Sequence, residues 1–302
     1  MKVVDDVLAC IGNTPMINLS RFGAPHIFAK AEHLNPGGSV KDRVARYLIE
    51  HAEADGELRP GMVIVEASSG NTGIGVSLVG VMKGYRVVIV MPENMSEERR
   101  KIIRAFGGEL IYTSAEGSLP EAVEKVRTMQ AEDPEHVWVP QQFENPLNPE
   151  VHYRETAREI WEQMEGKIDA FVAGVGSGGT LAGVGRFLKE QNPAVRIVAV
   201  EPKNSAALLG KEPGLHQIQG IGDGFIPPVL EVDLIDDVEI VTDADAIATA
   251  RALARRSGML VGTSAGANVW ASTRVSAKPG GERRVVTILP DRAERYFSTA
   301  LI

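Results

Sequence analysis

Short apolar runs alternate along the chain with stretches whose apolar positions recur every three or four residues. The apolar runs predict strands and the periodic stretches predict helices. The predicted strands lie at residues 63–67, 86–91, 110–113 and 168–173, with two more near Ile197 and Val286. The predicted helices lie at residues 74–82, 96–106, 118–132, 152–164 and 181–190. Strands that alternate with helices are typical of a parallel sheet covered by helices, so the pattern predicts an α/β fold.

Lys41 stands directly after a turn rich in glycine and proline. Residues 35–43 are Asn-Pro-Gly-Gly-Ser-Val-Lys-Asp-Arg, and a helix-compatible stretch follows at 44–49. Pro36 and the two glycines keep a helix from starting earlier, so we expect Lys41 in the first helical turn. The positive end of a helix dipole disfavours an ammonium group and favours a free amine, which condenses with aldehydes. The alternative is a solvated surface lysine, because lysine changes its protonation readily only when it is buried.

A second polar turn follows the predicted strand at 63–67. Ser68, Ser69 and Thr72 supply hydroxyls and Asn71 supplies an amide, just before the helix at 74–82. Together with the free N–H groups of a helix start, these groups suit a small carboxylate or phosphate. The alternative is ordinary helix capping, because Ser, Thr and Asn are the preferred cap residues.

A third turn, rich in glycine, joins the strand at 168–173 to the helix at 181–190. Its sequence from residue 174 is Gly-Val-Gly-Ser-Gly-Gly-Thr, which lets the backbone and the helix N–H groups approach an anion closely. Gly174, Gly176 and Gly179 also satisfy the spacing of a dinucleotide-binding fingerprint, with Glu201 about 20 residues further on. A nicotinamide-dependent dehydrogenase is therefore an alternative, although such a fingerprint is expected near the start of a dinucleotide-binding half.

Composition limits the classes of function. The 302 residues carry a net charge of −8 and 44% hydrophobic residues, which suits a core-forming α/β protein and argues against binding to nucleic acid or to anionic membranes. Cys10 is the only cysteine, so no disulfide can form within the chain and a reducing compartment is expected. The six histidines show no metal-site spacing, and we expect no metal. No signal peptide or long apolar stretch is apparent, so we expect a cytoplasmic protein.

Several short motifs follow one another along nearly the whole chain. They are Gly-Asn-Thr-Pro at 12–15, Ser-Val-Lys-Asp-Arg at 39–43, Ser-Gly-Asn-Thr-Gly at 69–73, Gln-Phe-Glu-Asn-Pro at 142–146, Gly-Ser-Gly-Gly-Thr at 176–180, Gly-Ile-Gly at 220–222 and Glu-Arg-Tyr at 294–296. In this order the set resembles the cysteine synthases (O-acetylserine sulfhydrylases) of the fold-type-II pyridoxal-phosphate enzymes.

The resemblance implies a role for each matching residue. It makes Lys41 the Schiff-base lysine and general base, and it makes Asn71 and Ser264 the partners of the cofactor's ring oxygen and pyridine nitrogen, with Thr263 as the alternative for the nitrogen. The loop that binds the cofactor's phosphate then consists of Gly176, Ser177, Gly178, Gly179 and Thr180. The residues that take the substrate are then Ser68, Ser69, Asn71, Thr72, Gln142 and Gly220.

The reaction implied by the resemblance is a β-replacement. O-acetyl-L-serine loses acetate to form an aminoacrylate intermediate on pyridoxal phosphate, and sulfide then adds to give L-cysteine. Alternatives with the same chemistry are a cystathionine β-synthase-like enzyme and enzymes that use thiosulfate or O-phosphoserine. A binding protein on the same scaffold, without catalysis, is a further alternative.

The resemblance also implies an organisation and partners. A smaller domain is expected at residues 40–145, and residues 1–39 with 146–302 are expected to form a larger domain that binds the phosphate, each built on a mostly parallel twisted sheet covered by helices. The expected assembly is a homodimer, and a complex with serine acetyltransferase is also implied.

Overall fold

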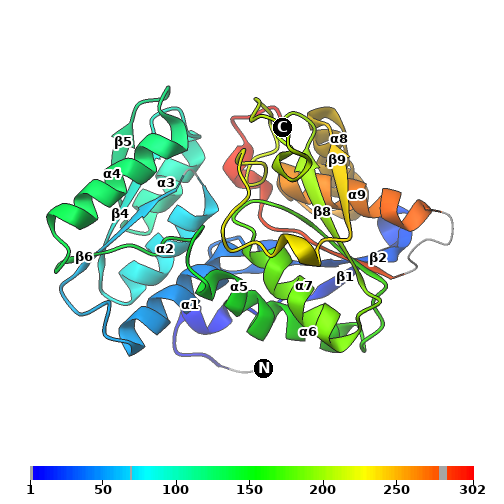
Figure 1. The fold of residues 1–302 in the computed structure, drawn as a ribbon, viewed down its shortest axis with the longest axis horizontal. Coiled ribbons are helices and arrows are strands. Elements are labelled where there is room, and N and C mark those ends of the chain that lie inside the picture. Colours follow the sequence, from blue (N-terminus) through cyan, green and yellow to red (C-terminus); the bar gives the residue numbers. More distant parts are fainter. Residues whose placement is uncertain (1–2, 69, 279–283) are drawn as a thin grey trace. The chain divides into compact units, whose positions relative to one another are not determined.

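The structure is a computed structural model that describes residues 3–68, 70–278 and 284–302. The chain forms two compact units, each built from two segments (Figure 1). The first unit consists of Met1–Ile11 and Asn35–Leu147, and the second consists of Gly12–Leu34 and Asn148–Ile302. The predicted domain boundaries at residues 40 and 145 stay a prediction.

The first unit is built on a parallel sheet with the strand order β5-β4-β3-β6. These strands are β3 (Val63–Ala67), β4 (Arg86–Pro92), β5 (Glu109–Thr113) and β6 (Val137–Trp138). Valine and isoleucine dominate β3 and β4, which pair with Glu66 opposite Ile89. Such β-branched runs suit parallel strands that are covered on both faces.

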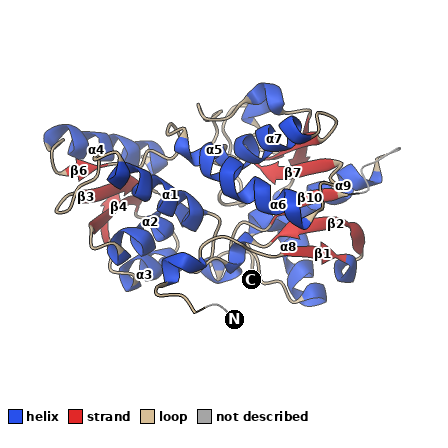
Figure 2. Cartoon of the chain, turned by 90° about the horizontal axis from the view of Figure 1, so that it is seen from below, coloured by secondary structure: helices blue, strands red, loops and turns tan. Residues whose placement is uncertain are grey.

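Helices cover both faces of this sheet (Figure 2). They are α1 (Lys41–Ala54), α2 (Asn71–Met82), α3 (Glu97–Ala105) and α4 (Ser118–Glu132). Val65 and Ala67 of β3 pack on one face against Ala122 and Val126 of α4. Because successive side chains of a strand point to opposite faces, Ile64 and Glu66 lie on the other face, which α2 covers.

The second unit contains a six-stranded sheet with the order β1-β2-β10-β7-β8-β9. Its strands are β1 (Met16–Leu19), β2 (Ala24–Lys30), β7 (Ala170–Gly174), β8 (Arg196–Pro202), β9 (Asp237–Val241) and β10 (Val285–Ile288). All neighbours are parallel except β1 and β2, which form an antiparallel pair.

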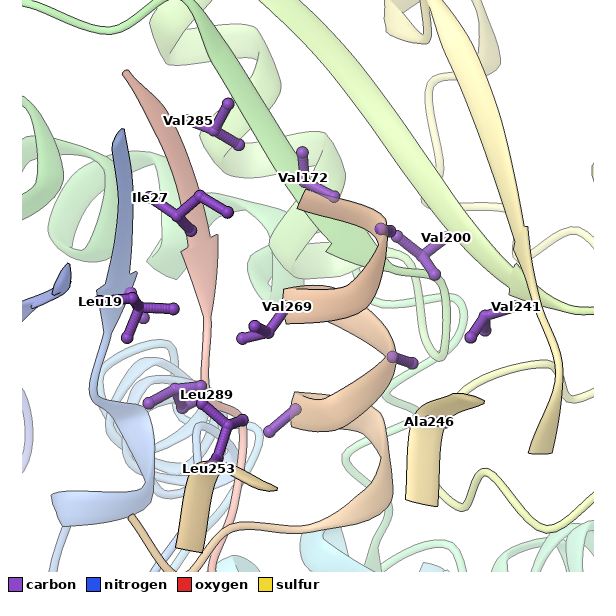
Figure 3. Close-up of a cluster of buried hydrophobic side chains, with 14 of the residues drawn as sticks. Leu19, Ile27, Val172, Val200, Val241, Ala246, Leu253, Val269, Val285 and Leu289 are labelled. Atoms are coloured by element: carbon purple, nitrogen blue, oxygen red, sulfur yellow. The ribbon is translucent and has the colours of Figure 1, made fainter. Parts of the chain in front are cut away.

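Two groups of helices pack on the second sheet. They are α5 (Leu147–Val151), a π-helical turn (His152–Thr156), α6 (Ala157–Gln163), α7 (Gly179–Gln191), α8 (Asp243–Ser257) and α9 (Thr263–Ala277). The cores on the two faces are separate: one includes α6 and α7, and the other includes α8 and α9. Figure 3 shows Val269 of α9 among Ile27, Val172 and Val285 from three neighbouring strands.

The structure confirms the predicted fold class, two mostly parallel sheets covered by helices. The strands at 63–67 and 86–91 and the helix at 181–190 lie within one or two residues of the predicted ranges. The predicted helix at 152–164 instead begins with the π-helical turn, and the antiparallel β1–β2 pair was not predicted. No helix in the described part of the chain is long and apolar enough to cross a membrane.

Candidate active site

Lys41 is the first residue of α1, as the sequence predicts, and it is half-buried. Its backbone N–H donates to the Ser39 hydroxyl at 3.2 Å. Asp42 closes the preceding glycine turn, because its Oδ2 accepts the Gly37 N–H at 2.6 Å. The turn therefore fixes where α1 begins and holds Lys41 at the positive end of the helix dipole.

Helix α2 packs tightly against the start of α1. A Cβ added to Gly75 of α2 would lie 2.9 Å from the backbone oxygen of Lys41, closer than real Cβ atoms approach. Glycine at this position therefore lets the two helices meet beside Lys41, so that the start of α1 and the polar turn before α2 are neighbours within the first unit.

Glu66 is a buried acid in the same unit. Burial raises the pKa of its carboxyl to about 8, while a hydrogen bond from the Gln141 backbone and the charge of Lys41 lower it. The carboxyl is 3% exposed and lies in the penultimate position of β3. Its charge is therefore coupled to that of Lys41, a relation that the sequence pattern did not indicate.

The polar turn between β3 and α2 is closed by Ser68. The Ser68 hydroxyl accepts the backbone N–H groups of Gly70 at 3.2 Å and of Gly73 at 2.9 Å. Ser68 therefore caps the start of α2, which is the structural alternative considered for this hydroxyl cluster. Asn71 is the first residue of α2 and is half-buried, whereas Ser69 lies outside the described residues.

Thr72 and Gln142, which are 70 residues apart in the sequence, meet within the first unit. The Thr72 hydroxyl donates to Gln142 Oε1 at 2.6 Å, and both side chains are buried. Gln142 lies in a turn in which Gln141 has a positive φ of 56° and its carbonyl accepts the N–H groups of Glu144 and Asn145. The hydrogen bond fixes the carboxamide so that its NH₂ group is oriented as a donor.

The glycine-rich turn of the second unit leads from β7 into α7. Gly178 occupies the N-cap position with a φ of 82°, so the N-cap residue has no side chain to accept a hydrogen bond from the helix start. A Cβ on Gly176 would clash with the backbone oxygen of Gly220, and one on Gly179 would clash with the Asn148 carboxamide. A close-packed turn that leads into a helix start with glycine at its N-cap fits a phosphate group.

Side chains from other segments hold this turn. Asn148 Nδ2 donates to the Ser177 hydroxyl at 3.0 Å, and Thr180 Oγ1 lies 3.3 Å from His152 Nε2. The Gly174 N–H donates to Asn268 Oδ1 at 2.8 Å. The sequence analysis assigned no role to Asn148, His152 or Asn268, because their spacing from the turn carries no local signal.

The start of α9 presents the predicted partners of a pyridine nitrogen. Thr263 is the first residue of α9, and its hydroxyl accepts the backbone N–H of Gln219 at 3.2 Å. Ser264 is the second residue and is 3% exposed. Gly220, with a φ of 89°, follows Gln219 in the second unit.

Glu201 is a buried residue whose carboxyl accepts a hydrogen bond from the backbone. The carboxyl is 2% exposed, and its two oxygens each accept the Leu208 N–H at 3.2 Å. Burial raises the pKa of this carboxyl against the effect of hydrogen bonds from the backbone of residues 207 and 208. Because the Glu201 carboxylate caps a neighbouring turn, its environment does not support a role as the ribose partner of a dinucleotide. Among the described residues, no group of three or more His, Cys, Asp or Glu could hold a metal ion.

Known proteins resemble this chain over its whole length. A model of the family described as "Pyridoxal-phosphate dependent enzyme" matches residues 7–291. A cysteine synthase of Staphylococcus aureus is 46% identical, with 99% of this chain and 97% of the relative covered.

Solved structures give the same result. A cysteine synthase from Entamoeba histolytica has a TM-score of 0.94 and 42% identity, with 99% of this chain and 91% of that chain covered. An O-acetylserine-dependent cystathionine β-synthase from Helicobacter pylori has a TM-score of 0.93 and 40% identity, with 100% and 99% covered. These comparisons decide against the dehydrogenase alternative.

Proposed function

Because the chain belongs to the family of pyridoxal-phosphate-dependent enzymes, we propose that it makes L-cysteine from O-acetyl-L-serine and sulfide. The observation that carries this proposal is the 46% identity to a cysteine synthase over 99% of the chain. The likeness is not confined to one motif, and it includes both compact units.

Four groups of the chain are proposed to hold the cofactor. The start of α7, where glycine is the N-cap residue, would offer backbone N–H groups to the phosphate in the segment Gly176–Thr180. Lys41 would supply the amine that bonds the cofactor, and Asn71 would supply an amide for its ring oxygen. Ser264 would face the pyridine nitrogen. In support of this choice, the hydroxyl of the neighbouring Thr263 already accepts the Gln219 backbone N–H.

The cofactor and the protein contribute different parts of the reaction. When bound, pyridoxal phosphate supplies a conjugated ring that takes up electron density as the substrate's α-proton leaves. Lys41 Nζ would accept that proton after the substrate displaces it, as a general base held at the start of α1. Acetate leaves from the β-carbon, and sulfide forms the new carbon–sulfur bond there.

The substrate carboxylate would lie against the first unit. Thr72 donates its hydroxyl hydrogen to Gln142 Oε1, and the Gln142 NH₂ group is the proposed donor to the carboxylate. Asn71 and Ser69 belong to the same proposed group. Ser68 would support the turn by capping α2, and Gly220 would contribute backbone from the second unit.

A second candidate function differs in the nucleophile. The Helicobacter pylori structure is named as an O-acetylserine-dependent cystathionine β-synthase, and another neighbour with a TM-score of 0.95 and 41% identity is named O-ureido-L-serine synthase. Both names contain a serine derivative. The candidates therefore differ in the nucleophile that attacks the β-carbon. Enzymes that use thiosulfate or O-phosphoserine remain further candidates on the same chemistry.

The proposal extends to the assembly and the compartment. We infer a cytoplasmic homodimer, since no disulfide can form from the single Cys10 and the family resemblance implies a dimer. A complex with serine acetyltransferase is also proposed from that resemblance. Size-exclusion chromatography with light scattering, with and without such an acetyltransferase, tests both.

An absorbance spectrum of the purified protein tests the reaction. We expect a visible band from lysine-bound pyridoxal phosphate, a change of that band on adding O-acetylserine, and its return on adding sulfide with cysteine formed. Homocysteine and hydroxyurea in place of sulfide test the nucleophiles that cystathionine and O-ureido-L-serine formation would require. A protein that shows no visible band, even after adding pyridoxal phosphate, contradicts the proposal.

A further inference from the structure

Arg99 is a buried cation on α3. The helix buries Arg99 and Ile103, which are four residues apart and therefore lie on one face. That face packs against α2, because a Cβ on Gly73 of α2 would lie 3.4 Å from Ile103 Cδ1. Arg99 lies one turn before Ile103 and is directed toward the first residues of α2.

The Arg99 guanidinium lies against Gly70, the N-cap residue of α2. A Cβ built on Gly70 would lie 3.8 Å from Arg99 Nε, 3.9 Å from Cζ and 4.0 Å from Nη2, which is ordinary van der Waals contact. Arg99 is only 4% exposed. The charge is therefore packed inside the first unit, beside the polar turn between β3 and α2 (residues 68–72).

Two other basic side chains of α3 lie at the surface. Lys101 pairs with Glu97 at 2.8 Å, and both are exposed. Arg104 Nη2 donates to the exposed Tyr112 hydroxyl at 3.0 Å. Arg99 is instead turned into the unit. Because a charge is costly to bury, a solvated surface role does not explain this position.

The polar turn has no charged side chain of its own. Its hydroxyls, its amide and the N–H groups at the start of α2 are dipoles, and the positive end of the helix dipole lies at the same place. The Arg99 guanidinium adds a full positive charge there. A helix N-terminus disfavours a cation and favours an anion, so this arrangement becomes favourable when an anion binds at the turn.

We propose that Arg99 is a positioning residue for the substrate carboxylate, a buried cation that lies against the polar turn and makes this neutral turn selective for an anion. This inference rests on the proposed function, in which the turn receives the carboxylate of O-acetylserine. The groups of the turn would bind the carboxylate oxygens. Arg99 acts through the turn, and its charge strengthens the binding of a carboxylate more than that of a neutral group.

Two substrates that differ only in this charge test the inference. O-acetyl-L-serine has a carboxylate where O-acetyl-L-serinamide has a neutral carboxamide. Arg99→Gln removes the charge and keeps a polar side chain, so KM for the acid should rise roughly tenfold while KM for the amide stays within about twofold of wild type. The change in kcat should be smaller, because the carboxylate keeps its charge throughout the reaction.

A conservative variant separates the charge from the shape of the side chain. Arg99→Lys keeps the charge and should hold KM for the acid within a few-fold of wild type. Arg104→Gln, which removes a cation from the surface of the same helix, is the matched control and should leave KM unchanged for both substrates. Thermal unfolding of each variant distinguishes a loss of stability from a loss of affinity.

Two outcomes overturn the inference. An equal rise of KM for the acid in Arg99→Lys and Arg99→Gln would show that the charge is not responsible. A rise by the same factor for acid and amide in Arg99→Gln would show that Arg99 only shapes the turn. A wild-type protein without a visible cofactor band, or without a response to O-acetylserine, would instead reject the proposed function itself.

Discussion

Helices α2 and α7 both begin after a strand that ends in a turn containing glycine, yet the two helix starts differ. Ser68 caps α2 by accepting the N–H groups of Gly70 and Gly73. The residue at the equivalent place before α7 is Gly176, which has no side chain, and the N-cap Gly178 adopts a φ of 82°. Both turns are candidate anion sites by their sequence, and the structure distinguishes them by the residue two positions before each N-cap, which is Ser68 at α2 and Gly176 at α7.

The difference teaches that a polar turn and a glycine turn prepare different kinds of site. Capping uses backbone donors at the start of α2, so recognition in the first unit must depend more on side chains such as Thr72 and Gln142. The start of α7 has glycine at positions 176 and 178, where no side chain can cap it, and close packing at Gly176 and Gly179 requires glycine, which suits a phosphate site. Recognition at the polar turn would therefore depend on side chains, whereas the glycine-rich turn at 176–180 would form an anion cradle.

The largest expected effect tests the reactive side of this comparison. Lys41→Ala removes the proposed base and the amine that bonds the cofactor, so kcat should fall by roughly 10²- to 10⁴-fold or more. Covalent attachment of pyridoxal phosphate, measured by mass spectrometry after borohydride reduction, should be lost. Lys101→Ala, which removes an exposed lysine paired with Glu97 at 2.8 Å, is the control and should retain both. Retained attachment in Lys41→Ala would reject its assigned role.

The next largest effect is expected at the anion cradle, the glycine-rich turn at residues 176–180. Gly179→Ala places a Cβ against the Asn148 carboxamide, which also holds Ser177. Overpacking of this kind costs about 1–3 kcal/mol, so the Kd for pyridoxal phosphate should rise roughly tenfold or more. Equilibrium dialysis or fluorescence titration measures it.

Gly185→Ala lies in the same helix and is the matched control for the cradle. Its Cβ would meet Ile197 at 3.3 Å, away from the turn, so cofactor affinity should stay close to wild type. Equal losses in the two variants would show that α7 responds to any added methyl group, and the cradle interpretation would then be wrong.

A smaller effect tests substrate recognition by the first unit. Gln142→Ala removes the partner of Thr72 and the proposed donor to the substrate carboxylate. A hydrogen bond to a charged group is worth about 1.5–3 kcal/mol, so KM for O-acetylserine should rise roughly 10- to 100-fold, with a smaller change in kcat. Steady-state kinetics measures both. Gln130→Ala, on α4, should leave KM unchanged, and an unchanged KM in Gln142→Ala would place the carboxylate elsewhere.

The smallest effect tests the cap. Ser68→Ala leaves the N–H groups of Gly70 and Gly73 without their acceptor, which typically costs about 1 kcal/mol. For a chain of this size, Tm should fall by about 2–4 °C. Ser257→Ala is the comparison, because its hydroxyl has no hydrogen-bond partner among the described residues. A larger loss of substrate binding than of stability in Ser68→Ala would indicate that Ser68 also contacts the substrate.

The amino-acid sequence by itself determined the α/β fold class, the start of α1 at Lys41 and the turn that leads into α7. These features depend on local properties of the chain. Proline and glycine limit where a helix can start, and β-branched runs favour strands. The order of the motifs was also sufficient to indicate the family.

Only the tertiary structure decided which distant groups meet and which groups are buried. Gln142 reaches Thr72 across 70 residues, and Asn148 reaches Ser177 across 29. Glu66 looked like one polar residue in an apolar strand, and its pKa is raised because burial removes its carboxyl from water, against the lowering effect of Lys41. Desolvation and hydrogen-bond partners depend on packing between elements, which spacing along one chain does not specify.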